Sequence, residues 1–337
     1  MTTGIIPPFM GLRRTSITVP KLIRAFAAAV LLVLSATPAP AAGPVAMATL
    51  VEGEAHLLRE TGRFVLAPGV ALQPGDLVET AANARLLRIE YTDGPVVDLG
   101  PASQAMIEAR LGPGGREPAA RFYLRQGWAK LGRAPSSRGV ASLLTPDVAL
   151  KGEGGSQVVQ AAASRTQVFA ESGKARLEAR DKRNQDAVDL AAGRLFDSAD
   201  WTERPRPNAA FVGAVPPSFL DPLPLRAARF KDRTVDAERV GDLRYEDVAG
   251  WLQAEPALRA RLAERWRGLA KKPEFRAALA ANIKRHPEWD RIVFPEKYTK
   301  PRPQPESSGA RAAPTARPAP RDSAPTVTTP QPARSAY

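Results

Sequence analysis

Only two histidines, His56 and His286, could serve general acid–base or metal chemistry in this chain of 337 residues. They do not form an H-x-x-x-H pair, and no G-x-S-x-G turn presents a nucleophilic serine. Cysteine is absent, which removes disulfides, thiolate catalysis and cysteine-based metal sites. We therefore expect both histidines to be ordinary surface residues.

Two pairs of carboxylates have a spacing that could serve glycoside hydrolysis, Glu52 with Glu54 and Asp93 with Asp98. Residues at i and i+2 of a strand share a face, so the first pair could meet one substrate. Exposed strands commonly carry such carboxylates, and we expect no catalysis. The glycine-rich run 151–156 lacks the spacing and the Lys-Ser/Thr ending of a phosphate-binding loop, so we expect a flexible corner. The sequence thus predicts no enzyme, no cofactor and no metal site.

The beginning of the chain has the parts of an export signal. Its first 24 residues hold four basic side chains and no acidic one, and an apolar stretch at 26–34 leads to Ala39-Pro40-Ala41. The apolar stretch is shorter than the roughly 20 residues of a membrane-spanning helix. We expect residues 1–42 to be a signal peptide and the protein to be periplasmic or secreted. An uncleaved anchor is the alternative, and Arg13-Arg14 leaves the twin-arginine route open.

Between residues 48 and 196, polar and apolar residues alternate in short stretches, which predicts strands. Leu87 and Ile89 share one face of such a stretch, for example, and Arg88 and Glu90 share the other. We therefore expect one face of each strand to line an apolar interior and the other to be wetted by solvent.

Turn residues separate these stretches. Pro74-Gly75-Asp76 suits a type II turn, because proline presets φ and glycine accepts a positive φ. Asp93-Gly94 is a hairpin signal. Further glycines are expected to define turns: Gly127, Gly152, Gly173 and Gly193. About ten strands at this spacing predict a mainly β fold, as a sandwich, barrel or β-solenoid.

Several stretches, taken in order over about residues 47–197, resemble the FecR domain. They are Val51–Ala55, Leu66–Gly69, Leu72–Thr80, Leu86–Gly94, Val97–Gly100, Leu124–Gly127, Thr145–Gly152, Val168–Ala175 and Val188–Gly193. The resemblance implies a non-enzymatic β module of the cell envelope with a solenoid-like or sandwich-like form.

The best-known proteins of that family are inner-membrane regulators of iron uptake, which couple an outer-membrane transporter to a sigma factor. They carry a cytoplasmic helical domain before their membrane span, whereas about 24 residues precede the apolar stretch here. In addition, Glu153 stands where the family usually has threonine. We therefore keep the signalling role as an alternative.

After a proline-rich connector at 200–243, the apolar residues recur at helical spacing. Pro256, Pro273 and Pro287 suit first-turn positions, where the missing N–H costs nothing. We expect a small helical region at 244–299 with two or three short helices.

Four arginines of this region could form a docking face for an anionic partner: Arg259, Arg261, Arg265 and Arg267. A solvated helix face with ion pairs to Glu255 and Glu264 is the plainer interpretation. The segment 300–337 combines nine prolines with six basic and two acidic residues, which predicts a disordered basic tail. In an exported chain, the net charge of +13 points to an anionic membrane surface rather than to nucleic acid.

The sequence therefore predicts five segments: a signal peptide (1–42), a FecR-like β domain (43–199), a proline-rich connector (200–243), a helical region (244–299) and a disordered tail (300–337). As function we expect a non-enzymatic binding or scaffolding module of the envelope that engages a protein or a glycan. A membrane-anchored regulatory sensor related to iron uptake and sigma-factor signalling is the alternative. A hydrolase of envelope polysaccharide is a third hypothesis.

Overall fold

The computed structural model describes residues 1, 43–109, 120–134, 137, 139–162, 165–180, 185–233 and 235–298. The expected signal peptide, apart from Met1, and the expected tail lie outside the described residues. The chain divides into two compact units, one through Val293 and one from Phe294 onward. Among the described residues, no helix is long and apolar enough to cross a membrane.

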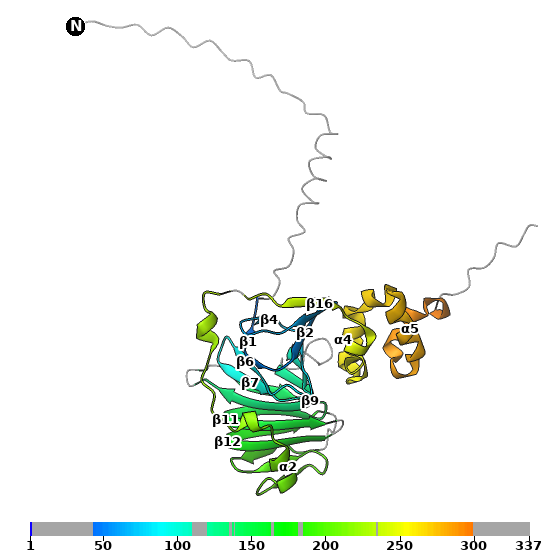
Figure 1. Cartoon of the computed structure of the whole chain (residues 1–337). Helices are drawn as coiled ribbons and strands as arrows, with labels where there is room; N and C mark the ends of the chain where they lie inside the picture. The colour runs from blue at the N-terminus through cyan, green and yellow to red at the C-terminus, as the bar shows by residue number, and fades with distance from the viewer. Residues whose placement is uncertain are drawn as a thin grey trace, which may run out of the picture. The chain divides into compact units, whose positions relative to one another are not determined.

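The described strands join into one mixed sheet, which confirms the mainly β fold (Figure 1). Its first half comprises β1 (Ala46–Glu52), β2 (Ala55–Arg59), β3 (Gly62–Val65), β4 (Ala71–Leu72), β5 (Leu77–Thr80), β6 (Leu86–Tyr91), β7 (Pro95–Leu99) and β8 (Gln104–Ala109). Its second half comprises β9 (Ala120–Arg133), β10 (Ala141–Leu144), β11 (Val148–Ala162), β12 (Arg165–Ala179), β13 (Val188–Ala191), β14 (Leu195–Asp197), β15 (Thr202–Arg204) and β16 (Glu238–Asp242).

Strand β9 is the branch point of the sheet. Its first half pairs with β8 and, in parallel, with β10, whereas its second half pairs with β7 and β11. The partners change at Gly127, where φ is +98° and an added Cβ would lie 2.4 Å from the Cα of Ser103. Only glycine fits this close approach, so the residue positions the two halves of the sheet.

The inward face of the strands agrees with the alternation in the sequence. Leu87 and Ile89 of β6 are fully buried in the main core. The outward face does not agree, because Arg88 and Glu90 are only 6% and 5% exposed. The expectation of a wetted face is wrong at β6, since the connector packs over it.

Three of the expected turn glycines, Gly127, Gly152 and Gly173, lie inside long strands, so the turns expected there are wrong. Gly152 pairs with Ala141 on one side and Ala175 on the other. The register between β11 and β12 shifts between Glu153 and Gly155, where β11 forms a β-bulge. Gly155 pairs with Gly173 of β12. A Cβ on Gly155 would lie 2.2 Å from the carbonyl oxygen of Ser172, so the glycines permit close strand contact rather than a corner. The flexible corner expected at 151–156 is therefore wrong.

The other turn positions lie between strands. Pro74-Gly75-Asp76 precedes β5, Asp93-Gly94 joins β6 to β7, and Gly193 lies between β13 and β14. The φ angles of Gly75, Gly94 and Gly193 are +85°, +109° and +81°.

The connector contains regular secondary structure. It holds α2 (Ala209–Ala214), η2 (Pro217–Phe219), η3 (Ala227–Phe230) and β16, which pairs with β3 at the edge of the sheet.

The small helical region follows, as expected. Its elements are α3 (Tyr245–Val248), η4 (Trp251–Gln253), α4 (Pro256–Arg265), η5 (Arg267–Lys271), α5 (Pro273–Ala281), η6 (Ile283–Arg285), η7 (Pro287–Trp289) and α6 (Asp290–Val293). Pro256, Pro273 and Pro287 each stand in the first turn of their helix. In the second unit, η8 (Pro295–Tyr298) is described.

Two buried tryptophans fasten the helical region to the β module. The indole N–H of Trp266 donates to the carbonyl of Glu60 (2.8 Å), and that of Trp251 donates to the carboxylate of Glu79 (2.7 Å). A buried indole needs such an acceptor, so each contact fixes both the position and the orientation of its ring. The helices thus have a defined place on the sheet.

Candidate functional site

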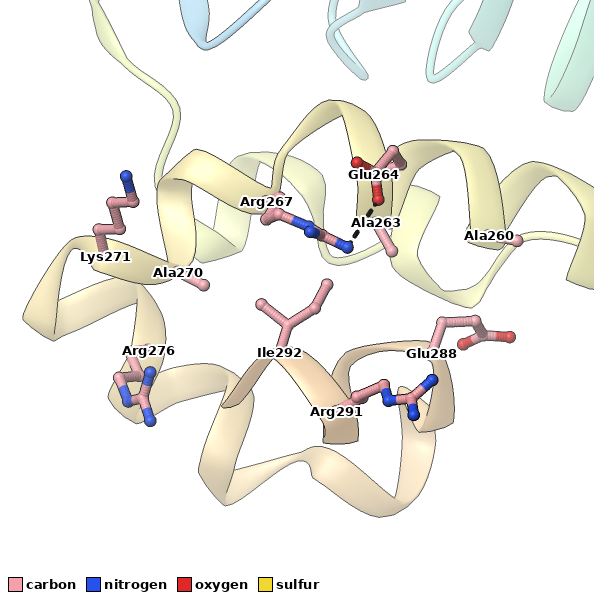
Figure 2. Close-up of a pocket in the computed structure, with 10 residues that line it drawn as sticks. All are labelled: Ala260, Ala263, Glu264, Arg267, Ala270, Lys271, Arg276, Glu288, Arg291 and Ile292. Carbon is pink, nitrogen blue, oxygen red and sulfur yellow. Dashed lines mark ion pairs between the residues drawn. The ribbon is translucent and has the colours of Figure 1, made fainter. Parts of the chain in front are cut away.

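The helical region contains a groove with a volume of about 550 Å³ (Figure 2). Its apolar lining consists of Ala260, Ala263, Ala270 and Ile292. Its charged lining consists of Glu264, Arg267, Lys271, Arg276, Glu288 and Arg291. Figure 2 shows Ile292 pointing from α6 toward α4, so the isoleucine forms part of the floor.

The spacing of the residues on α4 and η5 explains the groove. Ala260 and Glu264 lie four residues apart on α4 and so share a face, and Arg267 and Lys271 line the groove from η5. The larger apolar residues of α4 face the interior instead, as the burial of Leu262 shows. Small alanines therefore line the groove and leave room between α4 and α6.

Positive charge prevails at the rim. Glu264 is paired with Arg267 (2.9 Å), and Glu288 is paired with Arg259 (3.0 Å) behind the groove. Lys271 is exposed and makes no ion pair with any residue that the structure describes. An apolar floor under a basic rim attracts a ligand that carries both carboxylates and an aliphatic group.

One polar atom of the groove has no hydrogen-bond partner in the described part of the chain. This atom is Oε2 of Glu288, which is buried. A buried acceptor without a donor is costly, and a main-chain N–H of a ligand would satisfy it.

The four arginines expected to form a docking face do not lie together. Arg265 donates to the carbonyl of Gly75 (2.6 Å), and burial lowers the pKa of its guanidinium. Arg259 is held by Glu288, and of the four only Arg267 lines the groove. The face as expected, with Arg261 beside Arg259, is wrong, because residues two apart on a helix point in different directions.

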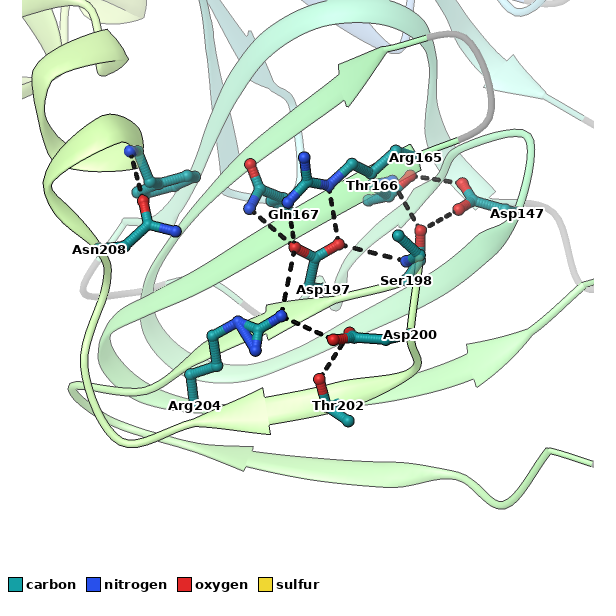
Figure 3. A network of polar contacts seen from close by, with 12 residues as sticks. Asp147, Arg165, Thr166, Gln167, Asp197, Ser198, Asp200, Thr202, Arg204 and Asn208 are labelled. Carbon is teal, nitrogen blue, oxygen red and sulfur yellow. Dashed lines mark hydrogen bonds and ion pairs between the residues drawn. The ribbon is translucent and has the colours of Figure 1, made fainter.

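A second polar cluster lies in the β module, where the ends of several strands meet (Figure 3). Asp147 accepts hydrogen bonds from the hydroxyls of Thr145 (3.0 Å), Thr166 and Ser198. A nucleophilic serine or threonine needs a base such as histidine or lysine beside it. Figure 3 labels no histidine or lysine in the network. The three hydroxyls named above donate to Asp147 instead.

The neighbouring part of this network is an ion pair. Asp197, which is 1% exposed, accepts from Arg165 (2.9 Å) and Gln167 (3.1 Å). The hydrogen bonds from Arg165 lower the pKa of the Asp197 carboxyl. The network therefore fastens the turn before β11 to β12 and to the end of β14.

Each carboxylate considered for hydrolysis lies beside a basic side chain, and Glu52 is 4.0 Å from Arg85. Asp98 lies against Arg88 (2.7 Å) on the covered face of the sheet, whereas Asp93 pairs with Arg121. Glu54 lies 3.3 Å from the ring of His56. Neither pair faces the groove, and the absence of catalysis stays a prediction.

Both histidines are buried, so the expectation of surface residues is wrong. His286 is fully buried between Tyr245, whose hydroxyl lies 2.8 Å from Nε2, and the carbonyl of Leu252. His56 packs against Arg63. Burial lowers the pKa of both rings, so they are neutral packing residues at neutral pH. Among the residues that the structure describes, no three His, Asp or Glu side chains form a metal-binding group.

Fold and groove together describe a mainly β module that carries a small helical region with a groove. No protein-family model matches the chain, and no curated protein matches it. Two crystal structures from Parabacteroides distasonis, described as a "putative anti-sigma factor", are similar in part, with 16% and 15% sequence identity and a TM-score of 0.29 for each. The similarity covers 38% of this chain and 57% of each of theirs. A likeness at this TM-score carries no argument about function.

Proposed function

We propose that this chain is a non-enzymatic binding module of the bacterial cell envelope, and that its groove takes an acidic, amphipathic segment of a partner protein. The observation that carries the proposal is the apolar floor of Ala260, Ala263 and Ile292 under a basic rim. The export signal expected at 1–42 and the FecR resemblance support the location.

A protein segment fits the groove better than a glycan does. Sugar rings are bound by stacking on aromatic side chains, and none of the 10 residues lining the groove is aromatic. An aliphatic side chain of a partner helix would pack on the alanines and Ile292, while its acidic neighbours meet Lys271 and Arg291. Helix-in-groove recognition of this kind uses side chains at i, i+3 and i+4.

The basic tail of the chain itself is a poor occupant. The segment 300–337 holds six basic and two acidic residues, so it has the same sign of charge as the rim. Like charges repel, which leaves the groove open to a partner in trans.

A regulatory sensor in the envelope is the second candidate. The FecR resemblance of about residues 47–197 supports this role, because the best-known proteins of that family are regulators of this kind. Under either role the groove would hold the partner, which in a sensor would belong to a transporter or a sigma-factor pathway.

The test uses the full chain and a labelled helical peptide in which leucines follow each other at i, i+4 and the other face is glutamate. We expect Lys271→Glu to weaken binding about tenfold, because an attraction becomes a repulsion. Lys284→Glu is the matched control, since Lys284 is an exposed lysine of the same region outside the groove.

A second peptide carries serine in place of each leucine and is expected to bind far more weakly. Equal weakening by Lys271→Glu and Lys284→Glu, or equal binding of the two peptides, would overturn the proposal. A photo-cross-linker at Ala260 of the full chain, used in cells, then identifies the natural partner by mass spectrometry.

A further inference from the structure

The face of the sheet formed by β6, β7 and β9 binds the main chain of the connector through charged side chains. Arg88 donates to the carbonyls of Leu223 (2.7 Å) and Pro224 (3.2 Å). Lys130 donates to the carbonyl of Phe219 (2.6 Å). These hydrogen bonds are made to main-chain carbonyl oxygens, which every residue has. They therefore do not depend on the side chains of the bound segment.

A carboxylate binds the other kind of main-chain group. Glu90 accepts hydrogen bonds from the N–H groups of Arg226 (2.8 Å) and Ala227 (3.0 Å). Its oxygen Oε1 also accepts from the hydroxyl of Thr49 (2.7 Å). The segment 218–227 is thus held by acceptors and donors placed in order along the sheet, and we call it the strap.

The binding groups are fixed by contacts that do not involve the strap. Arg88 forms a two-pronged ion pair with Asp98, in which both N–O distances are 2.7 Å. Lys130 is paired with Glu171 (2.8 Å). A site whose donors are already oriented loses little side-chain entropy when a segment binds.

Apart from these side-chain contacts, the strap has little to hold it on the sheet. Within the described residues, its backbone forms backbone–backbone hydrogen bonds only to other connector residues, and none to a strand of the sheet. Phe219 is its one fully buried anchor, whereas Leu220 and Leu225 are 72% and 49% exposed. Segments with few buried contacts and no ladder of backbone hydrogen bonds open locally.

The strap also fills its site incompletely. A cavity of about 590 Å³ lies between strap residues 221–225 and the sheet, where Val96, Gly132 and Ser156 line it. The hydroxyl oxygen of Ser156 is buried there and has no partner among the described residues. Room and an unused polar atom remain for a longer or larger segment.

We propose that this face is a second binding site, for an extended, proline-containing segment of a partner protein, and that the strap competes with that segment in cis. Proline suits the positions of Pro222 and Pro224, because Arg88 binds the carbonyls of Leu223 and Pro224 there, and proline has no N–H that would need an acceptor. Apolar side chains are required at the positions of Phe219 and Leu223. The site is separate from the groove of the helical region and does not depend on it.

The probe is a fluorescent peptide with the sequence of residues 216–228, titrated into the full chain and into variants. In Phe219→Ala the strap loses its anchor and opens more often, so the peptide is expected to bind at least tenfold more tightly than to the parent chain. Leu220→Ala is the matched control, because Leu220 is exposed, and it should bind as the parent does. A peptide with serine at the positions of Phe219 and Leu223 should not bind.

Two further variants test the main-chain contacts in the Phe219→Ala background. Glu90→Gln keeps the shape of the side chain but has one acceptor fewer, and Lys130→Met removes the donor. Each is expected to weaken peptide binding about tenfold. If Glu90→Gln does not fold, Lys130→Met alone tests the main-chain contacts. Hydrogen exchange should show faster exchange of residues 218–227 alone in Phe219→Ala.

Three results would overturn the proposal. The first is a folded Phe219→Ala chain that binds the peptide no better than the parent. The second is global unfolding of Phe219→Ala, which would make the strap an integral part of the fold. The third is equal binding of the serine-substituted peptide.

Discussion

Arg88 and Asp98 form a buried ion pair. The stability costs of replacing each residue alone should not sum to the cost of replacing both. Their side chains are 7% and 9% exposed, and both oxygens of Asp98 accept from Arg88. Arg88 has further acceptors in the carbonyls of Leu223 and Pro224, whereas Asp98 has no other donor among the described residues. Loss of Arg88 therefore leaves a buried charge alone, and loss of Asp98 does not.

The expected costs follow from this asymmetry. Arg88→Met should lower the free energy of unfolding by about 3–5 kcal/mol, the usual cost of stranding one member of a buried pair. Asp98→Leu should cost about 1–3 kcal/mol, because Arg88 keeps two hydrogen bonds. In the double variant no charge is stranded, so it should be more stable than Arg88→Met alone.

Urea denaturation followed by tryptophan fluorescence measures all three variants, and the midpoint and slope are fitted together. Arg176→Met is the control, because the Arg176–Asp189 pair lies on the exposed surface, where solvent screens the attraction, and its loss should cost far less than the loss of Arg88. A double variant whose cost equals the sum of the two single costs would refute the reasoning. So would a cost of Arg88→Met no larger than that of the control.

Further predictions concern buried polar contacts and are also measured by urea denaturation. Burial raises the pKa of the Glu79 carboxyl, so the folded chain binds this proton more tightly than the unfolded chain does; Glu79→Gln should therefore raise stability at about pH 7 and change little at about pH 3. Hydrogen bonds from Arg165 lower the pKa of Asp197, so its charge stabilises the fold above about pH 4. Asp197→Asn should cost about 1–3 kcal/mol at about pH 7 and less in acid, and an equal cost at both would contradict the assignment. Trp266→Phe should cost about 1–3 kcal/mol, because the carbonyl of Glu60 loses its donor; no change would show that this contact does not hold the helices.

The strand pattern was readable from the sequence because period-two alternation is a local property. Leu87 and Ile89 face the core as their spacing predicts. What covers the opposite face is not local, since the connector residues that Arg88 and Glu90 bind are more than 130 residues away. No spacing rule shows that a polar face of a strand will be covered by a distant segment.

Glycine was misread for a related reason. A run of glycines has the same composition in a corner and in a bulge, and the difference at Gly155 lies in the strand that faces it. The groove of the helical region was partly readable, because Ala260 and Glu264 lie four residues apart on one α-helix. The contribution of Arg291 required the fold, since it comes from a different helix.

Strand β16 has a consequence for how this chain avoids sticking to its own copies. It pairs with β3 and forms the edge of the sheet. Its exposed side chains include Glu238, Arg239 and Asp242. Charged side chains on the last strand of a sheet discourage another chain from adding to it. A fragment ending near residue 199 would lack β16 and leave β3 as an unpaired edge strand. Strands of other copies could then add to β3 and form fibril-like stacks, which β16 prevents in the intact chain.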